Sequence, residues 1–215
     1  MNGLIIDGME IFAKSRPRPE SDEDRRRLLL DSHTMEALRA LDSTLEHAEQ
    51  YDGFGGNPIA APELQKATFM AALLHDLGKV EPKFQLRIHR ALYKDSVDIQ
   101  ALSRRLYGGE RSWGLRHEEL SFMYNRMIRL AVRGSEGSQL LSQSAVPILL
   151  HHYNYEYGAV DQSSVWNLIR ARASEEKVRS AAEFLRNHAD ELLGGLSRVA
   201  EAFAKESRNE GIREA

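Results

Sequence analysis

Apolar residues recur at helical spacing along much of the chain, starting at Leu28. From there they return every three or four positions, as Leu29, Met35, Leu38, Leu41 and Leu45. This period predicts a helix over 28–50. The run YDGFGGNP then ends it, because glycine and proline do not continue a helix.

The same period predicts further helices. One begins at Ala61–Pro62, since proline is tolerated in a first turn, and runs to Gly78, which we expect as a left-handed cap. Other helical patterns cover about 84–107, 118–132, 162–173 and 174–206. Strand signals are weak, with one short hairpin allowed for in 105–115. The expected fold class is therefore all-α.

Length and composition fit one domain over 1–215. The 215 residues are 42% hydrophobic, enough for one sizeable core. Segment 14–27, KSRPRPESDEDRRR, is almost wholly charged or proline, so it predicts a flexible loop.

Composition also narrows the chemistry. The chain has Cys 0, which excludes disulfides, cysteine-ligated zinc and a thiol nucleophile. The net charge of −3 gives no global basic field of the kind typical of nucleic-acid binders. Apolar runs such as Phe69–Leu74 are too short to cross a bilayer, so we expect a cytoplasmic protein.

Two polar pairs follow apolar runs directly. His75 and Asp76 follow FMAALL, and His151 and His152 follow VPILL. Polar groups at the rim of buried elements cost desolvation free energy, which a bound cation offsets for histidine and carboxylate together. These histidines therefore have two interpretations: they are metal ligands, or they are ordinary surface or core residues.

Further ligands would have to come from other helices. His33, in the first predicted helix, and His117, before the 118–132 helix, are available. A carboxylate has two oxygens, so Asp76 is able to bridge two metals.

These residues carry a resemblance to a known family. The order H, HD, H, HH is similar to that of the HD-domain metal-dependent phosphohydrolases. The strings LLHDLGKVEPKFQ (73–85), RHEELS (116–121) and LLHHY (149–153) resemble the HD nuclease of type I CRISPR interference. The resemblance spans His33 to at least His152, more than half of the chain, and implies an HD-domain helical bundle.

It also implies residue roles. His33, His75 and Asp76 would hold one metal, and Lys79 would lie near the scissile phosphate as a catalytic point charge. The second metal would be held by four residues: Asp76, His117, His151 and His152. Nitrogen and oxygen ligands in a six-coordinate site favour manganese, nickel, cobalt or iron, with magnesium as a further option.

The family has a late aspartate that completes the first metal site. Asp190 has a family-like local sequence and is our prediction, although helical phase places it nearer a polar face. Asp161 is the alternative and equally resembles a helix N-cap. His47, His89 and His188 match no motif, and we expect them at the surface.

The resemblance implies a metal-dependent endo- or exonuclease for single-stranded DNA in antiviral defence. The sequence carries no helicase motif, so it resembles either the stand-alone nuclease or an excised domain, and the expected partners are a helicase, on a separate chain or segment, and an RNA-guided surveillance complex. The alternatives are a phosphohydrolase of nucleotides or cyclic nucleotides and a degenerate, non-catalytic HD module.

Other motifs admit two interpretations. Seven basic residues between the HD motif and His117 either form a groove for a phosphate backbone or lie on ordinary solvated faces. They are Arg87, Arg90, Lys94, Arg104, Arg105, Arg111 and Arg116. Glu118 and Ser121 either cap a helix or orient His117. Three tyrosines, Tyr153, Tyr155 and Tyr157, either stack on bases or, as we favour, pack against the domain.

Overall fold

The protein is a bundle of helices with one small hairpin. The computed structural model describes residues 3–6, 8–14, 19–50, 62–93, 115–152, 167 and 175–207. Within these ranges the only sheet pairs β1 (Ile5–Ile6) with β2 (Met9–Glu10) in antiparallel fashion. The all-α prediction is confirmed. The hairpin lies near the N-terminus, whereas the region 105–115 falls mostly outside the described residues.

Within the described residues the helices follow the predicted order, while the predicted helix over 162–173, apart from residue 167, and residues 94–107 of the predicted 84–107 helix lie outside them. The bounds of the helices are α1 Asp22–Arg27, α2 Leu30–Gln50, α3 Pro62–Leu74, α4 Pro82–Tyr93, α6 His117–Ala131, α7 Glu136–Leu150, α9 Glu175–Asn187 and α10 Ala189–Glu206, with a 3₁₀ turn, η3, at Leu77–Val80. The apolar run at 145–150 is the end of α7, a helix that the sequence did not predict as such. The pattern over 174–206 is two helices that break at His188.

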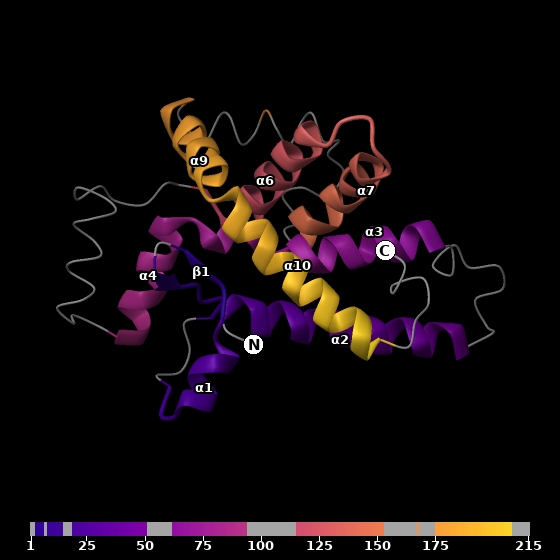
Figure 1. Cartoon of the computed structure of the whole chain (residues 1–215), viewed down its shortest axis with the longest axis horizontal. Coiled ribbons are helices and arrows are strands. Elements are labelled where there is room, and N and C mark those ends of the chain that lie inside the picture. Colours follow the sequence, from indigo (N-terminus) through magenta and orange to yellow (C-terminus); the bar gives the residue numbers. More distant parts are fainter. Residues whose placement is uncertain are drawn as a thin grey trace.

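The core lies where the long helices meet. α3 packs against α2 and α7, α6 packs against α7, and α10 crosses α2 (Figure 1). Buried side chains from four of these helices include Leu38, Phe69, Tyr124 and Ile148. Phe69 stacks on Phe203 of α10 at 5.9 Å between ring centroids. Sequence-distant helices are thus held in one body.

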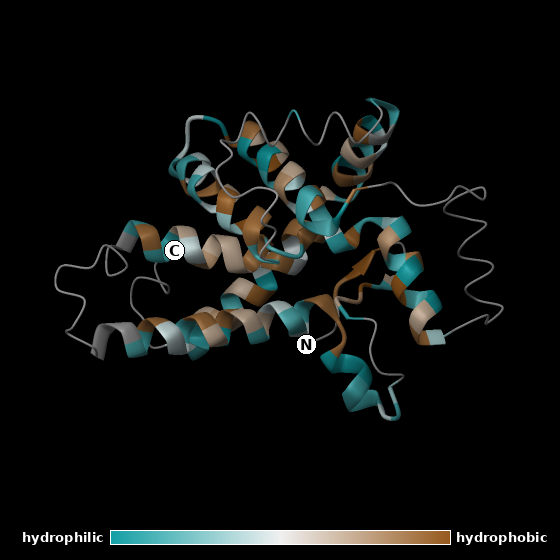
Figure 2. Cartoon of the chain, turned by 180° about the vertical axis from the view of Figure 1, so that it is seen from behind, coloured by the Kyte–Doolittle hydropathy of each residue, from teal (hydrophilic) through white to brown (hydrophobic). Residues whose placement is uncertain are grey.

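Helix α1 differs from the predicted loop over 14–27. The Ser21 hydroxyl accepts a hydrogen bond from the Asp24 backbone N–H, and acidic residues precede basic ones along the helix. Both features favour a helix because they complement its dipole. The exposed, hydrophilic α1 projects from the body (Figure 2), and residues 15–18 of the segment lie outside the described ranges.

Helix α3 ends before Gly78. Its last residue is Leu74, and Gly78 lies within η3, so the predicted left-handed cap is wrong. Positive φ values in the described residues occur at Gly8 and Gly134. Over those same residues, no helix is apolar and long enough to span a bilayer.

Candidate metal centre

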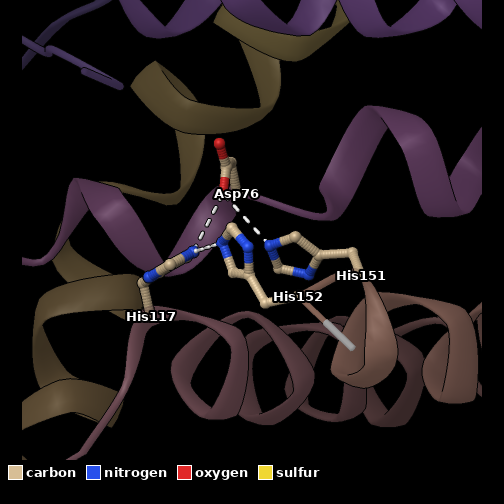
Figure 3. Close-up of side chains that lie close together, drawn as sticks. All are labelled: Asp76, His117, His151 and His152. Carbon is tan, nitrogen blue, oxygen red and sulfur yellow. Dashed lines mark hydrogen bonds and ion pairs between the residues drawn. The ribbon is translucent and has the colours of Figure 1, made fainter. Parts of the chain in front are cut away.

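The Asp76 carboxylate lies at the centre of the site, in the turn between α3 and η3, where it is 1% exposed. Its Oδ2 atom lies 3.0 Å from His33 Nε2 and 3.4 Å from His75 Nε2. Its Oδ1 atom lies 3.3 Å from His117 Nε2 and 3.4 Å from His151 Nε2 (Figure 3). The two oxygens of one carboxylate therefore face two different sets of imidazoles.

Each set forms a group of candidate metal ligands. The first comprises His33, His75 and Asp76, and the second comprises Asp76, His117, His151 and His152. Within each group the ligand atoms lie within 4.8 Å of one another. The Nε2 atoms of His117 and His152 are 2.7 Å apart. The fold thus brings α2, the end of α3, the start of α6 and the end of α7 together around Asp76.

Two of the imidazoles are fixed from behind by backbone carbonyls. His75 Nδ1 lies 2.7 Å from the Ala72 oxygen, and His151 Nδ1 lies 2.6 Å from the Ile148 oxygen. A carbonyl accepts, so each Nδ1 carries the proton and, in the neutral ring, Nε2 has a free lone pair. These lone pairs point at the carboxylate, an arrangement that is repulsive unless a proton or a metal cation lies between nitrogen and oxygen.

The buried polar atoms fit a cation. Asp76 Oδ1 and His151 Nε2 have no hydrogen-bond partner within the described part of the chain. Buried groups of this kind are costly when unpaired. A divalent ion bound by neutral imidazoles and a carboxylate would satisfy both atoms at once.

Electrostatics favour the metal-binding forms of Asp76 and His152. Burial alone would raise the pKa of Asp76, but imidazoles that turn a proton toward the carboxylate outweigh burial and hold that pKa far below its ordinary value. Burial lowers the pKa of His152, and the neighbouring His151 and His117 lower it further. An ionised carboxylate and neutral imidazole are the forms that bind metal.

Two other imidazoles have carboxylates behind them. His117 Nδ1 lies 3.4 Å from the Glu118 carboxylate, which is 4% exposed. His33 Nδ1 lies 3.9 Å from Glu36 Oε2, which is 49% exposed. Such carboxylates fix the orientation and basicity of a ligating histidine. For Glu118 the structure thus favours orientation of His117, while the neighbouring Glu119 caps α6 by accepting from the Arg116 backbone N–H.

Close packing of η3 on α6 sets the distance between Asp76 and His117. A Cβ at Gly78 would lie 2.0 Å from the His117 carbonyl oxygen and 2.7 Å from the Ser121 nitrogen. The Ser121 hydroxyl accepts from the Gly78 backbone N–H at 2.7 Å and donates to the His117 carbonyl at 2.8 Å. Gly78 is therefore required for close approach, a role that the sequence did not indicate.

Glu81 is a buried acidic residue beside the contact between η3 and α6. It lies at the end of η3 and is 3% exposed, and burial raises its pKa to about 7. Its carboxylate accepts from the Phe84 backbone N–H at 3.0 Å. The Tyr124 hydroxyl on α6 is buried, and burial together with the charge of Glu81 raises the pKa of Tyr124. The η3–α6 contact thus contains a buried ionisable pair.

Gln85 ties the N-terminal segment to the site. Its fully buried amide accepts from the Phe12 N–H at 2.9 Å and donates to the Phe12 carbonyl at 2.8 Å. It also donates to the Lys79 carbonyl at 2.6 Å. The glutamine of the FQ motif thus links two segments, a structural role that the motif alone did not reveal.

The remaining predicted site residues have different positions. Lys79 Nζ lies 2.6 Å from Asp76 Oδ2. Asp190 is exposed in the first turn of α10 and belongs to neither ligand group. Asp161 lies outside the described residues, as do the three tyrosines.

Of the unassigned histidines, His47 is exposed as predicted. His89 is half-buried, with its ring 5.1 Å from that of Phe12, so the surface prediction is wrong for it. His188 is partly buried beside Phe184. Of the seven basic residues, Arg87, Arg90 and Arg116 fall within the described ranges.

The fold and the histidine–aspartate cluster define an HD-type metal-binding domain. The family model "Cas3, HD domain" matches residues 12–210, so the chain belongs to the Cas3 HD domain family. This is a family of metal-dependent nucleases of CRISPR interference. Neither a curated protein nor a solved structure gives a significant match.

Proposed function

We propose that the chain hydrolyses phosphodiester bonds of single-stranded DNA with two divalent cations. The observation that carries this proposal is the Asp76 carboxylate, whose two oxygens face separate sets of imidazoles. His33, His75 and Asp76 would hold one cation. The second would be held by Asp76, His117, His151 and His152.

The bound cations would supply an activated water near neutral pH and neutralise charge on the phosphate and the leaving oxygen. The side chains around the centre orient the ligands and balance the charge. Asp76 stays ionised, because its pKa is lowered. Glu118 holds the His117 ring, and the Lys79 ammonium adds a positive charge beside Oδ2, where it attracts a phosphate. No side-chain nucleophile is needed.

Family membership supports a nucleic-acid substrate in CRISPR interference. A single strand fits the proposal because its backbone is able to reach a recessed centre without a second strand. The proposed partners are a helicase, on a separate chain or on a further segment, and an RNA-guided surveillance complex that deliver this strand.

The test uses purified protein stripped by a chelator and resupplied with manganese, nickel, cobalt, iron or magnesium one at a time. Circular single-stranded DNA, linear single-stranded DNA and a cyclic dinucleotide serve as substrates. We expect both DNAs to be cut with at least one transition metal and the cyclic dinucleotide to remain intact. Cutting of the circle further identifies endonuclease action.

Asp76→Asn is the matched variant, since it keeps the shape of the side chain and removes its charge. We expect it to lower DNA cleavage roughly 10³-fold or more, because it weakens both cation sites. Hydrolysis of the cyclic dinucleotide with intact DNA would instead support a nucleotide phosphohydrolase. Metal binding without turnover on any substrate would support a non-catalytic HD module.

A further inference from the structure

An open pocket of about 910 Å³ lies beside the second ligand group. The N-terminal segment, α4 and the start of α6 form its walls, and Lys79, His117 and His152 are part of its lining. Neither His33 nor His75 lines it. Whatever occupies this pocket therefore meets the second ligand group and Lys79 first.

The charge of the pocket is opposite to that of the chain. Its lining includes the cations Lys14, Lys79, Arg87 and Arg116 and a single carboxylate, Glu118, whereas the chain as a whole has a net charge of −3. Such a local concentration of positive charge attracts a polyanion.

Arg87 is the cation most available to a ligand. It is exposed on α4, and its guanidinium forms no ion pair with any residue that the structure describes. Lys14, in contrast, is held by Glu36 at 2.9 Å, and Arg116 lies 3.5 Å from Glu118. An unpaired guanidinium beside a candidate metal centre is well suited to hold a phosphate in bidentate fashion.

Part of the pocket lining is apolar. Phe84, Ile88 and Leu115 line it, and the Phe84 ring lies 5.2 Å from that of His117. Cations beside apolar and aromatic surface are the usual means of binding single strands, because the cations follow the phosphates while bases or sugars contact the apolar groups.

We propose that this pocket binds the nucleotides flanking the scissile phosphate on one side, with Arg87 and Arg116 holding backbone phosphates and Phe84, Ile88 and Leu115 contacting bases or sugars. The inference rests on the proposed nuclease function. It adds the direction of approach: the strand reaches Asp76 between α4 and α6, from the side of His117 and His152.

Binding is measured first, by fluorescence anisotropy of a labelled single-stranded oligonucleotide in an Asp76→Asn background. We expect Arg87→Ala to weaken binding roughly tenfold, because one charge-assisted contact is lost. The slope of log K against log salt should fall by about 0.7, the value for one phosphate on a single strand. Arg87→Lys should recover much of the affinity, since it retains the charge.

The matched control is Arg133→Ala, which removes an exposed arginine just beyond the other end of α6. It should leave both affinity and slope unchanged. Equal weakening by Arg133→Ala and Arg87→Ala would overturn the proposal, because it would indicate only a general effect of charge. Absence of oligonucleotide binding in the Asp76→Asn protein would overturn it as well.

Cleavage separates this inference from the proposed function. Bis(p-nitrophenyl) phosphate is a small phosphodiester that needs the metal centre but is too short to fill the pocket. Arg87→Ala should lower kcat/KM on the oligonucleotide about tenfold more than on the small diester. Equal losses on both substrates would overturn the pocket assignment. Failure of the unaltered protein to hydrolyse either substrate with any metal would reject the nuclease proposal, while the binding experiment would still decide the pocket.

Discussion

The two sides of the Asp76 carboxylate differ in composition and surroundings. On the Oδ2 side, two imidazoles share the oxygen with the Lys79 ammonium. On the Oδ1 side, His117 and His151 face an oxygen that has no hydrogen-bond partner among the described residues. One side is already partly neutralised by a protein cation, and the other is not.

The sides also differ in access. Two members of the Oδ1 group line the open pocket, and the Oδ2 group does not line it. More ligands and less competing charge favour tighter cation binding on the Oδ1 side, because Lys79 repels a cation on the other. We therefore expect the group containing His117 to fill first during a metal titration, and the group containing His33 to fill second.

The largest effect expected within this comparison comes from removing one ligand on each side. His117→Ala should abolish the tighter of two binding events in isothermal titration with manganese, and His33→Ala the weaker one. Each should lower DNA cleavage roughly 100-fold, since each leaves one cation in place. Loss of the same binding event in both variants would contradict the assignment of separate sites.

The late aspartate predicted from the sequence belongs to the same test. Asp190→Asn and Asp161→Asn are compared in the titration. If either residue completes the first site, its variant should weaken only the binding event that His33→Ala abolishes. An unaltered second event in both variants would indicate that the first site has three protein ligands.

Gly78→Ala should disturb the spacing between the sides without removing a ligand. The added methyl group would meet the His117 carbonyl, so η3 and α6 must move apart. We expect a loss of about 2 kcal/mol in the free energy of unfolding, typical of overpacking. Urea denaturation measures it, and Gly137→Ala, whose nearest neighbour is a side-chain oxygen at 3.5 Å, is the control. Equal stability of the two variants would show that the junction is not tightly packed.

Glu81→Gln probes the same junction through pH. The pKa of Glu81 is about 7 in the folded protein, above its ordinary value of 4.5. Below about pH 4.5 the carboxyl is protonated in both the folded and the unfolded chain, so its ionisation does not affect the free energy of unfolding. As the pH rises toward 7 the unfolded chain ionises more readily, and the free energy of unfolding falls. A glutamine side chain does not ionise, so the free energy of unfolding of Glu81→Gln should not fall in this way. Relative to the unaltered protein it should rise on the order of 2 kcal/mol between pH 4.5 and 7.5. Chemical denaturation at a series of pH values measures the difference. A constant difference across that range would contradict the raised pKa.

The smallest effect should come from the carboxylates behind the imidazoles. Glu118→Gln is expected to weaken metal affinity on its side about tenfold, because buried Glu118 fixes His117. Glu36→Gln should have a smaller effect on the His33 side, since Glu36 is half-exposed, more distant and paired with Lys14. Equal effects would show that burial does not govern this support.

Much of the site follows from sequence because its chemistry is concentrated in a few motifs. His75 and Asp76 end a strongly apolar helix, and His151 and His152 end another, so the sequence predicts polar groups at buried rims. Helical periodicity likewise identifies α2 and α6 nearly to their ends. Local signals suffice where a residue's role depends on its own helix.

Roles that depend on long-range contacts were not predictable in this way. From the sequence, Gly78 resembles a helix cap. A glycine is needed there because a Cβ would collide with the α6 backbone at His117, 39 positions later. The Gln85 side-chain amide both accepts from and donates to the backbone of Phe12, which lies 73 residues away, so no local pattern reveals this contact. Helix α1 was missed because mixed charge resembles a loop until its cap and charge order are considered.

The Gln85 amide connects the N-terminal segment of the chain to the candidate metal centre. Through it, Phe12 and Lys79 are joined by a single side chain. A truncated protein beginning after Lys14 would leave the buried Gln85 amide without its Phe12 partner and would remove Ala13 and Lys14 from the pocket lining. Variants that shorten or fuse the N-terminal segment are therefore expected to alter the candidate metal centre as well as the fold.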